Sequence, residues 1–184
     1  MSTKMPNLYN GEEMSDFIID VESDGPCPGP YSMVCFGAVF AHDTSKTFYG
    51  KIKPISDNWI PEALAISGFS REQHLEFDEP EPVIKKFHQW VNDTNDRGRP
   101  VMWSDNIAYD WQWVNHYSHV YGSNNPFGFS GRRIGDVYCG MVGDLRANHK
   151  WKKFRKTKHT HDPLCDALGN AEALLQIKTM LVSR

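Results

Sequence analysis

Apolar runs separated by polar turns dominate the first third of the chain and predict three strands. Residues 17–21, 33–41 and 47–53 are rich in apolar side chains, and the polar segment His-Asp-Thr-Ser-Lys separates the second run from the third. Short apolar runs bounded by turn-forming residues are typical of buried strands. Because short connections join strands that run in opposite directions, we expect an antiparallel meander.

From residue 61 onward, apolar positions recur every three or four residues, which predicts helices. Pro61 suits the first position of a short helix over 61–67, and the segment Ser-Arg-Glu-Gln at 70–73 has the form of a capping box. Further helices are expected over residues 81–94, 108–121, 137–147 (capped by Asp136) and 163–182, with short strands at 100–104 and 132–134. Three strands followed by helices that alternate with two strands indicate an α/β fold, a mixed five-stranded sheet flanked by helices.

Length and composition indicate one globular domain over residues 1–184, with a polar N-terminal extension over 1–15. The chain is 40% hydrophobic and contains six Trp residues, which favours a packed core over disorder. The N-terminus shows no secretory signal, and the longest apolar run is far too short to cross a bilayer. We therefore expect no membrane partner. The four cysteines form no CxxC pair and suggest no disulfide framework, so we expect a reducing cytoplasmic location.

Charge is distributed unevenly along the chain. Residues 1–96 contain 7 basic and 16 acidic residues, a net charge of −9, whereas residues 97–184 contain 13 basic and 7 acidic residues, a net charge of +6. Between Asp144 and Asp162, seven basic residues occur without a single acid. This basic segment is consistent with a solvated surface loop, and equally with a surface that neutralises the phosphates of a nucleic acid.

Two carboxylates, Asp20 and Glu22, close the first apolar run. Side chains two residues apart in a strand point to the same face, so both are expected to project together from the end of the strand. Adjacent carboxylates repel each other unless a cation lies between them, and hard oxygen ligands suit Mg²⁺ or Mn²⁺. The pair alone is also consistent with two acids that simply face water, so a metal site requires partners elsewhere in the chain.

Two later segments supply further acids at the starts of helices. Asp110 follows Asn106 by four residues and falls in the first helical turn, where the helix dipole favours a carboxylate. Asp166 falls in the first turn of the last predicted helix, five residues after His161. Both acids could serve only as helix caps or dipole partners.

A zinc site is a second interpretation of the last segment. His159, His161 and Cys165 are the types of residue that bind zinc, but a structural site of this kind needs a fourth ligand.

Taken together and in order, Asp20-x-Glu22, Asn106-x₃-Asp110 and His161-x₄-Asp166 resemble the DEDDh branch of the DnaQ-like 3′–5′ exonucleases. That branch includes RNase T, oligoribonuclease and polymerase proofreading subunits, and the resemblance spans residues 17–175. The sequences of the motifs are most similar to those of a subgroup that contains a mycobacterial exoribonuclease and exonuclease A of the T-even phages. The last motif departs from many members, which have Ala where this chain has Pro163.

The resemblance implies an RNase H-like fold and a site with two divalent cations, Mg²⁺ or Mn²⁺. Asp20, Glu22 and Asp166 would hold one cation, and Asp20 and Asp110 would help to hold the second. His161 would be the general base that takes a proton from the attacking water. The products would be nucleoside 5′-monophosphates released from a 3′ end.

The same resemblance suggests where nucleic acid would bind. Gly68 and Phe69, in a segment similar to the family's His-Gly-Ile motif with Ser67 in place of His, would line the pocket of the terminal nucleotide. Trp151 and Phe154 are interleaved with the basic residues and could stack on unpaired bases. The remaining candidate contacts are Ser23, Asn106, Arg132, Arg133, Lys150, Lys152, Lys153, Arg155, Lys156 and Lys158.

The substrate implied is RNA, single-stranded or with a 3′ overhang, and the alternative is DNA, as for the phage relative. An RNase H-type endonuclease and an inactive nucleic-acid-binding module are further alternatives. An inactive module predicts the loss of a metal ligand, and all the expected acids are present. Related enzymes often form dimers, so a homodimer is also implied.

Overall fold

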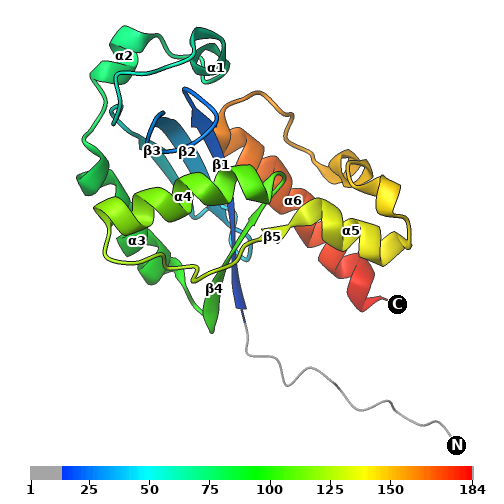
Figure 1. Cartoon of the computed structure of the whole chain (residues 1–184). Helices are drawn as coiled ribbons and strands as arrows, with labels where there is room; N and C mark the ends of the chain where they lie inside the picture. Colours follow the sequence, from blue (N-terminus) through cyan, green and yellow to red (C-terminus); the bar gives the residue numbers. More distant parts are fainter. Residues whose placement is uncertain (1–13, 184) are drawn as a thin grey trace, which may run out of the picture.

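A five-stranded mixed sheet forms the centre of the computed structural model, which describes residues 14–183 (Figure 1). The strand order is β3-β2-β1-β4-β5; β1 pairs antiparallel with β2 and β2 with β3, whereas β1–β4 and β4–β5 are parallel. The predicted fold class is therefore confirmed. The strands are β1 (Met14–Ser23), β2 (Met33–Phe40), β3 (Thr47–Lys51), β4 (Arg99–Ser104) and β5 (Arg132–Arg133).

Six α-helices and two 3-10 helices surround the sheet within the described residues. Ser70 forms the predicted capping box, and Asp162 caps the last helix by accepting a hydrogen bond from the Cys165 N–H at 2.9 Å. The helices are α1 (Pro61–Ile66), α2 (Arg71–Leu75), α3 (Pro80–Thr94), α4 (Ile107–Tyr121), α5 (Ile134–Val142), η1 (Leu145–Ala147), η2 (Lys150–Phe154) and α6 (Pro163–Val182).

Two sequence predictions are wrong in detail. The helix predicted over 137–147 begins earlier, at Ile134, and ends at Val142, so Asp136 lies in its first turn and does not cap it. The polar extension predicted over 1–15 lies outside the described residues as far as residue 13, and its last two residues, Met14 and Ser15, already belong to β1.

The sheet has a hydrophobic core on each face. Along β1, Phe17 and Ile19 pack with α3 and α4 on one face, and Ile18 packs with α5 and α6 on the other (Figure 1). Alternation of side chains along a strand places Asp20 and Glu22 on the face of Ile18, toward α6. Within the described residues, every helix is too short or too polar to cross a bilayer, and all four cysteines are free.

Candidate active site

The end of β1 extends beyond its parallel neighbour. Pairing between β1 and β4 stops at Ile18 and Trp103, and β1 continues to Ser23. On the side of β1 that no longer pairs with β4, the Val21 N–H donates a hydrogen bond to Asp110 Oδ1 at 3.1 Å. Asp110, in the first turn of α4, is only 3% exposed, so the motif acid that follows β4 is brought against β1 as the sequence predicts.

Gly37 on β2 allows α6 to begin directly against the sheet. Gly37 is the cross-strand partner of Asp20, and a Cβ atom at Gly37 would lie 2.4 Å from backbone atoms of Pro163 and Leu164. Only a residue without a side chain permits this close approach. The first turn of α6 therefore lies beside Asp20, and it carries Asp166, which is 1% exposed.

The segment between η2 and α6 wraps around Asp166. The backbone N–H groups of Thr160 and His161 each donate a hydrogen bond to its carboxylate at 3.0 Å. His161 alone among the described non-glycine residues has a positive φ, 62°, a conformation that is costly for a side chain and is held here by these bonds. The exposed imidazole of His161 has Nδ1 3.9 Å from Glu22 Oε1.

Three carboxylates converge at this point. Asp20, Glu22 and Asp166 each offer an oxygen, and the three oxygens all lie within 4.8 Å of one another. An all-oxygen set of this kind matches the ligand preference of Mg²⁺ or Mn²⁺. The structure thus brings together the residues that the sequence predicts for the first cation, and Asp110, bonded to the Val21 N–H, is near enough for its charge to raise the pKa of Asp20.

The electrostatics of the site also favour cation binding. Burial, reinforced by the carboxylates of Asp110, Glu22 and Asp166, raises the pKa of Asp20 well above its ordinary value, and the Arg155 guanidinium opposes this shift. Burial raises the pKa of Glu22 to about 7, with further contributions from Asp166 and Asp110. Burial likewise raises the pKa of Asp110 to about 7, against hydrogen bonds that lower it. A divalent cation would relieve this repulsion, so the residues present fit such an ion.

The basic segment is only partly available to a ligand. Lys152 Nζ pairs with Asp105 at 2.6 Å, and Lys150 Nζ pairs with Asp144 at 3.4 Å. The side chain of Arg155 is 9% exposed and donates a short hydrogen bond to Asn170. The exposed lysines at the surface of this segment include Lys153, Lys156 and Lys158.

The proposed stacking role of Trp151 is wrong. Its indole is fully buried in the core between the sheet and α6, with Nε1 donating to the Asn148 carbonyl at 2.9 Å. Phe154 is half-buried and packs edge-on against Tyr138, with ring centroids 5.9 Å apart. The aromatic spacing in this segment therefore reflects packing of the two 3-10 helices.

Several predicted nucleic-acid contacts have other partners. Ser23 is buried, and its hydroxyl contacts the Tyr109 hydroxyl and the Gly25 carbonyl. Arg132 lies over the Trp103 ring and reaches the sulfur of Met14, at the end of β1 remote from Glu22.

Two further predicted nucleic-acid contacts, Arg133 and Asn106, differ in how far their side chains are exposed to solvent. Arg133 Nε donates to the Asp105 carbonyl at 2.9 Å, and its Nη1 lies 3.5 Å from Asp136. Asn106 is exposed just before α4, so of these two residues Asn106 has the side chain open to a ligand.

Gly68 and Phe69 lie beside a shallow pocket of about 520 Å³. Gly68, with φ of 76°, ends the turn after α1, and the Phe69 ring packs edge-on against Phe77 with Lys51 Nζ 4.7 Å from its centre. Lys51 pairs with Cys35, which in turn pairs with Glu22. Because neighbouring strands are about 4.8 Å apart, the backbones of Lys51 and Glu22 are about 10 Å apart.

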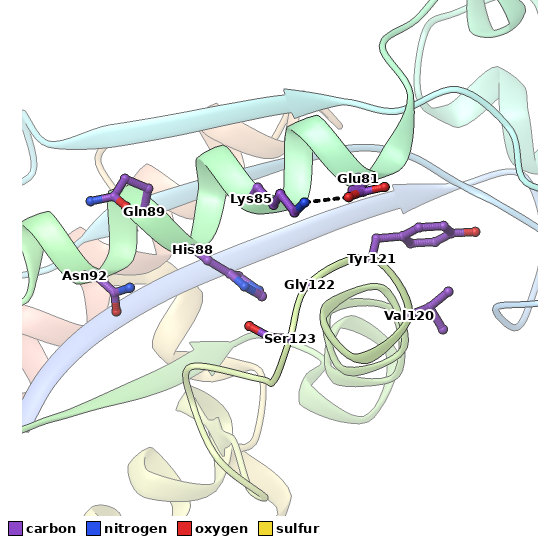
Figure 2. Close-up of a pocket in the computed structure, with 9 residues that line it drawn as sticks. All are labelled: Glu81, Lys85, His88, Gln89, Asn92, Val120, Tyr121, Gly122 and Ser123. Atoms are coloured by element: carbon purple, nitrogen blue, oxygen red, sulfur yellow. Dashed lines mark hydrogen bonds and ion pairs between the residues drawn. The ribbon is translucent and has the colours of Figure 1, made fainter.

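A larger pocket, of about 570 Å³, lies elsewhere in the molecule. It is formed between α3 and the C-terminal end of α4 (Figure 2). Asp110 lies in the first turn of α4, at the opposite end of the helix. His88, which lines it, bonds the Ser118 hydroxyl at 2.9 Å. Lys85 pairs with Glu81 one turn away on α3 (Figure 2). None of the residues predicted for the active site lines this pocket.

Comparisons with known proteins agree with this geometry. Residues 15–178 match the family model described as the 3′–5′ exoribonuclease Rv2179c-like domain. The chain is 34% identical over 166 residues to a protein of Escherichia coli named 3′–5′ DNA exonuclease Cap18, covering 84% of this chain and 86% of that protein.

Solved structures share the fold at low sequence identity. The nuclease domain of 3′hExo, a DEDDh family member bound to rAMP, superposes with a TM-score of 0.69 at 15% identity, covering 91% of this chain and 92% of that one. E. coli exonuclease I in complex with a dA16 oligonucleotide has a TM-score of 0.62 at 13% identity and covers 93% of this chain, which spans 43% of that enzyme. The fold is RNase H-like, and the chain belongs to the Rv2179c-like family of DEDDh-type 3′–5′ exonucleases.

Proposed function

We propose that this exonuclease removes nucleotides one at a time from the 3′ end of a single strand by a two-metal mechanism with His161 as the general base. The observation that carries the proposal is the convergence of Asp20, Glu22 and Asp166, with oxygens within 4.8 Å of one another, beside an exposed imidazole. An internal cutter would need the acids but has no evident need for a pocket that receives a terminal nucleotide.

Each acid has a distinct proposed role. Asp20, Glu22 and Asp166 would hold one divalent cation, and Asp20 and Asp110 would contribute to the second. When bound, two such cations supply an activated water and stabilise negative charge on the attacking and leaving oxygens at phosphorus. The Val21 N–H fixes the Asp110 carboxylate, and the loop N–H groups fix Asp166, so the ligands are oriented before a cation arrives.

His161 is well suited to accept a proton from the attacking water. Its imidazole is exposed, so it can release that proton to solvent after each cycle. Its backbone N–H is bonded to Asp166, which holds the ring close to the carboxylates while leaving both ring nitrogens outside that bond. Protonation of the departing 3′ oxygen by solvent and release of a nucleoside 5′-monophosphate complete the reaction.

For the sugar, the similarity to Cap18 favours DNA, and we propose DNA as the first substrate. The family model carries the description of an exoribonuclease, so RNA, which the resemblance to that subgroup implies, is the second candidate. Discrimination depends on contacts to the 2′-hydroxyl. The exposed Lys153, Lys156 and Lys158 would hold the upstream phosphates of either polymer.

The test uses 5′-labelled single-stranded DNA and RNA of one sequence, together with duplexes bearing 3′ overhangs, in Mg²⁺, Mn²⁺ or EDTA. We expect a ladder that shortens from the 3′ end, faster on DNA, and no cleavage in EDTA. Faster hydrolysis of RNA would select the second candidate. A single internal cut would refute the exonuclease mechanism. Sedimentation of the active protein tests the implied homodimer.

A further inference from the structure

Two imidazoles and one carboxylate meet beside the carboxylate cluster. His159 Nδ1 lies 2.5 Å from Asp166 Oδ2, and the rings of His159 and His161 have centroids 4.4 Å apart. Each of these three residues offers one ligand atom, and the three atoms all lie within 4.8 Å of one another. The proposed hydrolysis uses His161 and Asp166 and gives His159 no role.

The backbone explains why this group forms. The N–H groups of Thr160 and His161 are both bonded to the Asp166 carboxylate, which holds the loop against the first turn of α6. Held in this way, with the left-handed conformation at His161, the loop presents both imidazoles to the same carboxylate. His159 remains half-exposed, so an ion in solution can reach it.

The ligand chemistry differs from that of the catalytic acids. Imidazole nitrogen suits zinc and the later first-row divalent metals, whereas Mg²⁺ prefers oxygen ligands. Two imidazoles and one carboxylate form a recognised zinc ligand set that leaves a fourth position open. In the zinc interpretation of the sequence the third ligand was Cys165; among the described residues, the group that converges contains Asp166 instead.

We propose that His159, His161 and Asp166 bind Zn²⁺ or a similar late transition-metal ion, and that this ion inhibits the exonuclease. An ion held there withdraws Asp166 from the magnesium ligands and occupies the nitrogen of His161 that would accept a proton. The inhibition rests on the proposed function, but the binding of zinc does not. Inhibition is expected to be relieved by a chelator and weakened by excess Mg²⁺, because the two ions compete for Asp166.

His159→Gln tests the site, because it removes one zinc ligand and leaves every proposed catalytic residue in the chain. Zn²⁺ titration by calorimetry, and the visible absorption of Co²⁺ bound in its place, report binding without any substrate. We expect His159→Gln to weaken Zn²⁺ binding about tenfold or more and to raise the inhibitory Zn²⁺ concentration in parallel. Inhibition of the variant is expressed relative to its own activity in Mg²⁺ alone, because His159 also contacts Asp166. His149→Gln, at an exposed histidine outside the group, is the matched control and should change nothing.

The possible failures are distinguishable. Unchanged Zn²⁺ affinity in His159→Gln would overturn the site and assign the zinc to the carboxylates alone. Weakened binding without any inhibition of the wild type would overturn the inhibitory role and leave the site standing. An enzyme inactive on every 3′ end in Mg²⁺ would refute the proposed function and the inhibition with it, and the titration would still decide the site.

Discussion

Asp16 and Asp20 lie four residues apart on the same face of β1, and the protein surrounds them in opposite ways. Asp16 is 1% exposed, and donors enclose it. Trp103 Nε1 donates to one oxygen at 2.6 Å, and His42 Nε2 lies 3.2 Å from the other. The ammonium group of Lys178, from the last turns of α6, pairs with that second oxygen. Asp16 is therefore a carboxylate whose charge the protein itself compensates.

Asp20 has mainly negative neighbours. The carboxylates of Asp110, Glu22 and Asp166 all raise its pKa, and the Arg155 guanidinium is the cation that opposes them. Arg155 also bonds Asn170, so it is not dedicated to the carboxylates. The protein thus leaves the negative charge around Asp20 largely uncompensated.

The difference is the one expected between a structural acid and the metal ligand that we propose for Asp20. A buried carboxylate that serves stability is paired and hydrogen-bonded, because an unpaired charge in the interior is costly. A carboxylate that serves catalysis is left with repulsive neighbours that a bound cation relieves, and its site is destabilising until that cation arrives. Removal of the charge at the two positions should therefore have opposite consequences.

The largest expected effect is the loss of activity in Asp20→Asn. This substitution removes the ligand that the two proposed cations share, and with it several kcal/mol of transition-state stabilisation. We expect the rate of 3′-end hydrolysis in saturating Mg²⁺ to fall on the order of 10³-fold or more. In EDTA, the same variant should melt at a higher temperature than wild type, because one of the repelling charges is gone.

Asp16→Asn is the matched control for that result. Its activity, measured at a temperature where it is folded, should stay within a few-fold of wild type. Equal losses of activity at the two positions would contradict the division into a structural and a functional acid.

Gly37→Ala should have the next largest effect, because it displaces the helix that carries Asp166. The new methyl group would overlap the backbone of Pro163 and Leu164, and backbone atoms cannot rotate away. A shift of about 1 Å at a reacting group can cost about 10²-fold in rate, and overpacking costs about 1–3 kcal/mol of stability. Hydrolysis rates and urea unfolding of the variant measure the two effects.

Gly140→Ala provides the comparison for that substitution. Gly140 is exposed on α5 with open space around its Cβ position, so Ala there should stabilise the helix by about 0.5–1 kcal/mol and leave activity intact. Full activity in Gly37→Ala would show that α6 need not lie so close to β2.

How much the sequence could predict follows from the range of each interaction. The strands, the Pro163 helix start and the acids at element ends depend on local periodicity and spacing, and the structure has them where the sequence predicts them. The role of Gly37 depends on which helix crosses β2 at that residue, and nothing near Gly37 in the chain reveals it. Trp151 lies among lysines in sequence, yet it is buried because a 3-10 helix turns its ring inward. Nothing near Asp16 in the chain indicates that it is buried, since its partners come from distant elements.

Asp16→Asn should lower stability where Asp20→Asn raises it. Asn keeps one oxygen that can accept from Trp103 but has no negative charge, so the partly buried Lys178 loses its carboxylate partner, at a cost of about 1–3 kcal/mol in the free energy of unfolding. Urea unfolding at pH 7.5 measures this cost. Asp93→Asn, on the exposed face of α3, should change stability by less than about 0.5 kcal/mol. A neutral result at Asp16 would mean that the buried pair contributes specificity and not stability.

The pH dependence of the metal-free protein gives the smallest effect and the most direct view of the uncompensated charge. In the unfolded chain the pKa of Glu22 is about 4.3, and in the folded protein burial raises it to about 7. Between these values the folded state binds more protons at Glu22 than the unfolded state does. The contribution of Glu22 to the free energy of unfolding therefore falls as pH rises and is lowest above pH 7. Burial lowers the pKa of His74 to about 4, so below about pH 6.5 its contribution to the free energy of unfolding rises with pH. Measurements on wild type alone would therefore not separate the contribution of Glu22 from that of His74.

Comparison with Glu22→Gln removes that background, because both proteins contain the same histidines. In EDTA, the free energy of unfolding of the variant should equal that of wild type near pH 4.5 and exceed it by about 1–2 kcal/mol at pH 8. The difference is smaller than the pKa shift of Glu22 alone would give, because Asp20 and Asp110 take up part of the protons bound at the site. Saturating Mg²⁺ should remove the advantage of the variant, since the ion favours the ionised wild-type carboxylates. Thermal unfolding across this pH range measures both differences. If the two proteins instead had parallel profiles in EDTA, the repulsion around Asp20 would already be compensated by the protein, and the contrast with Asp16 would disappear.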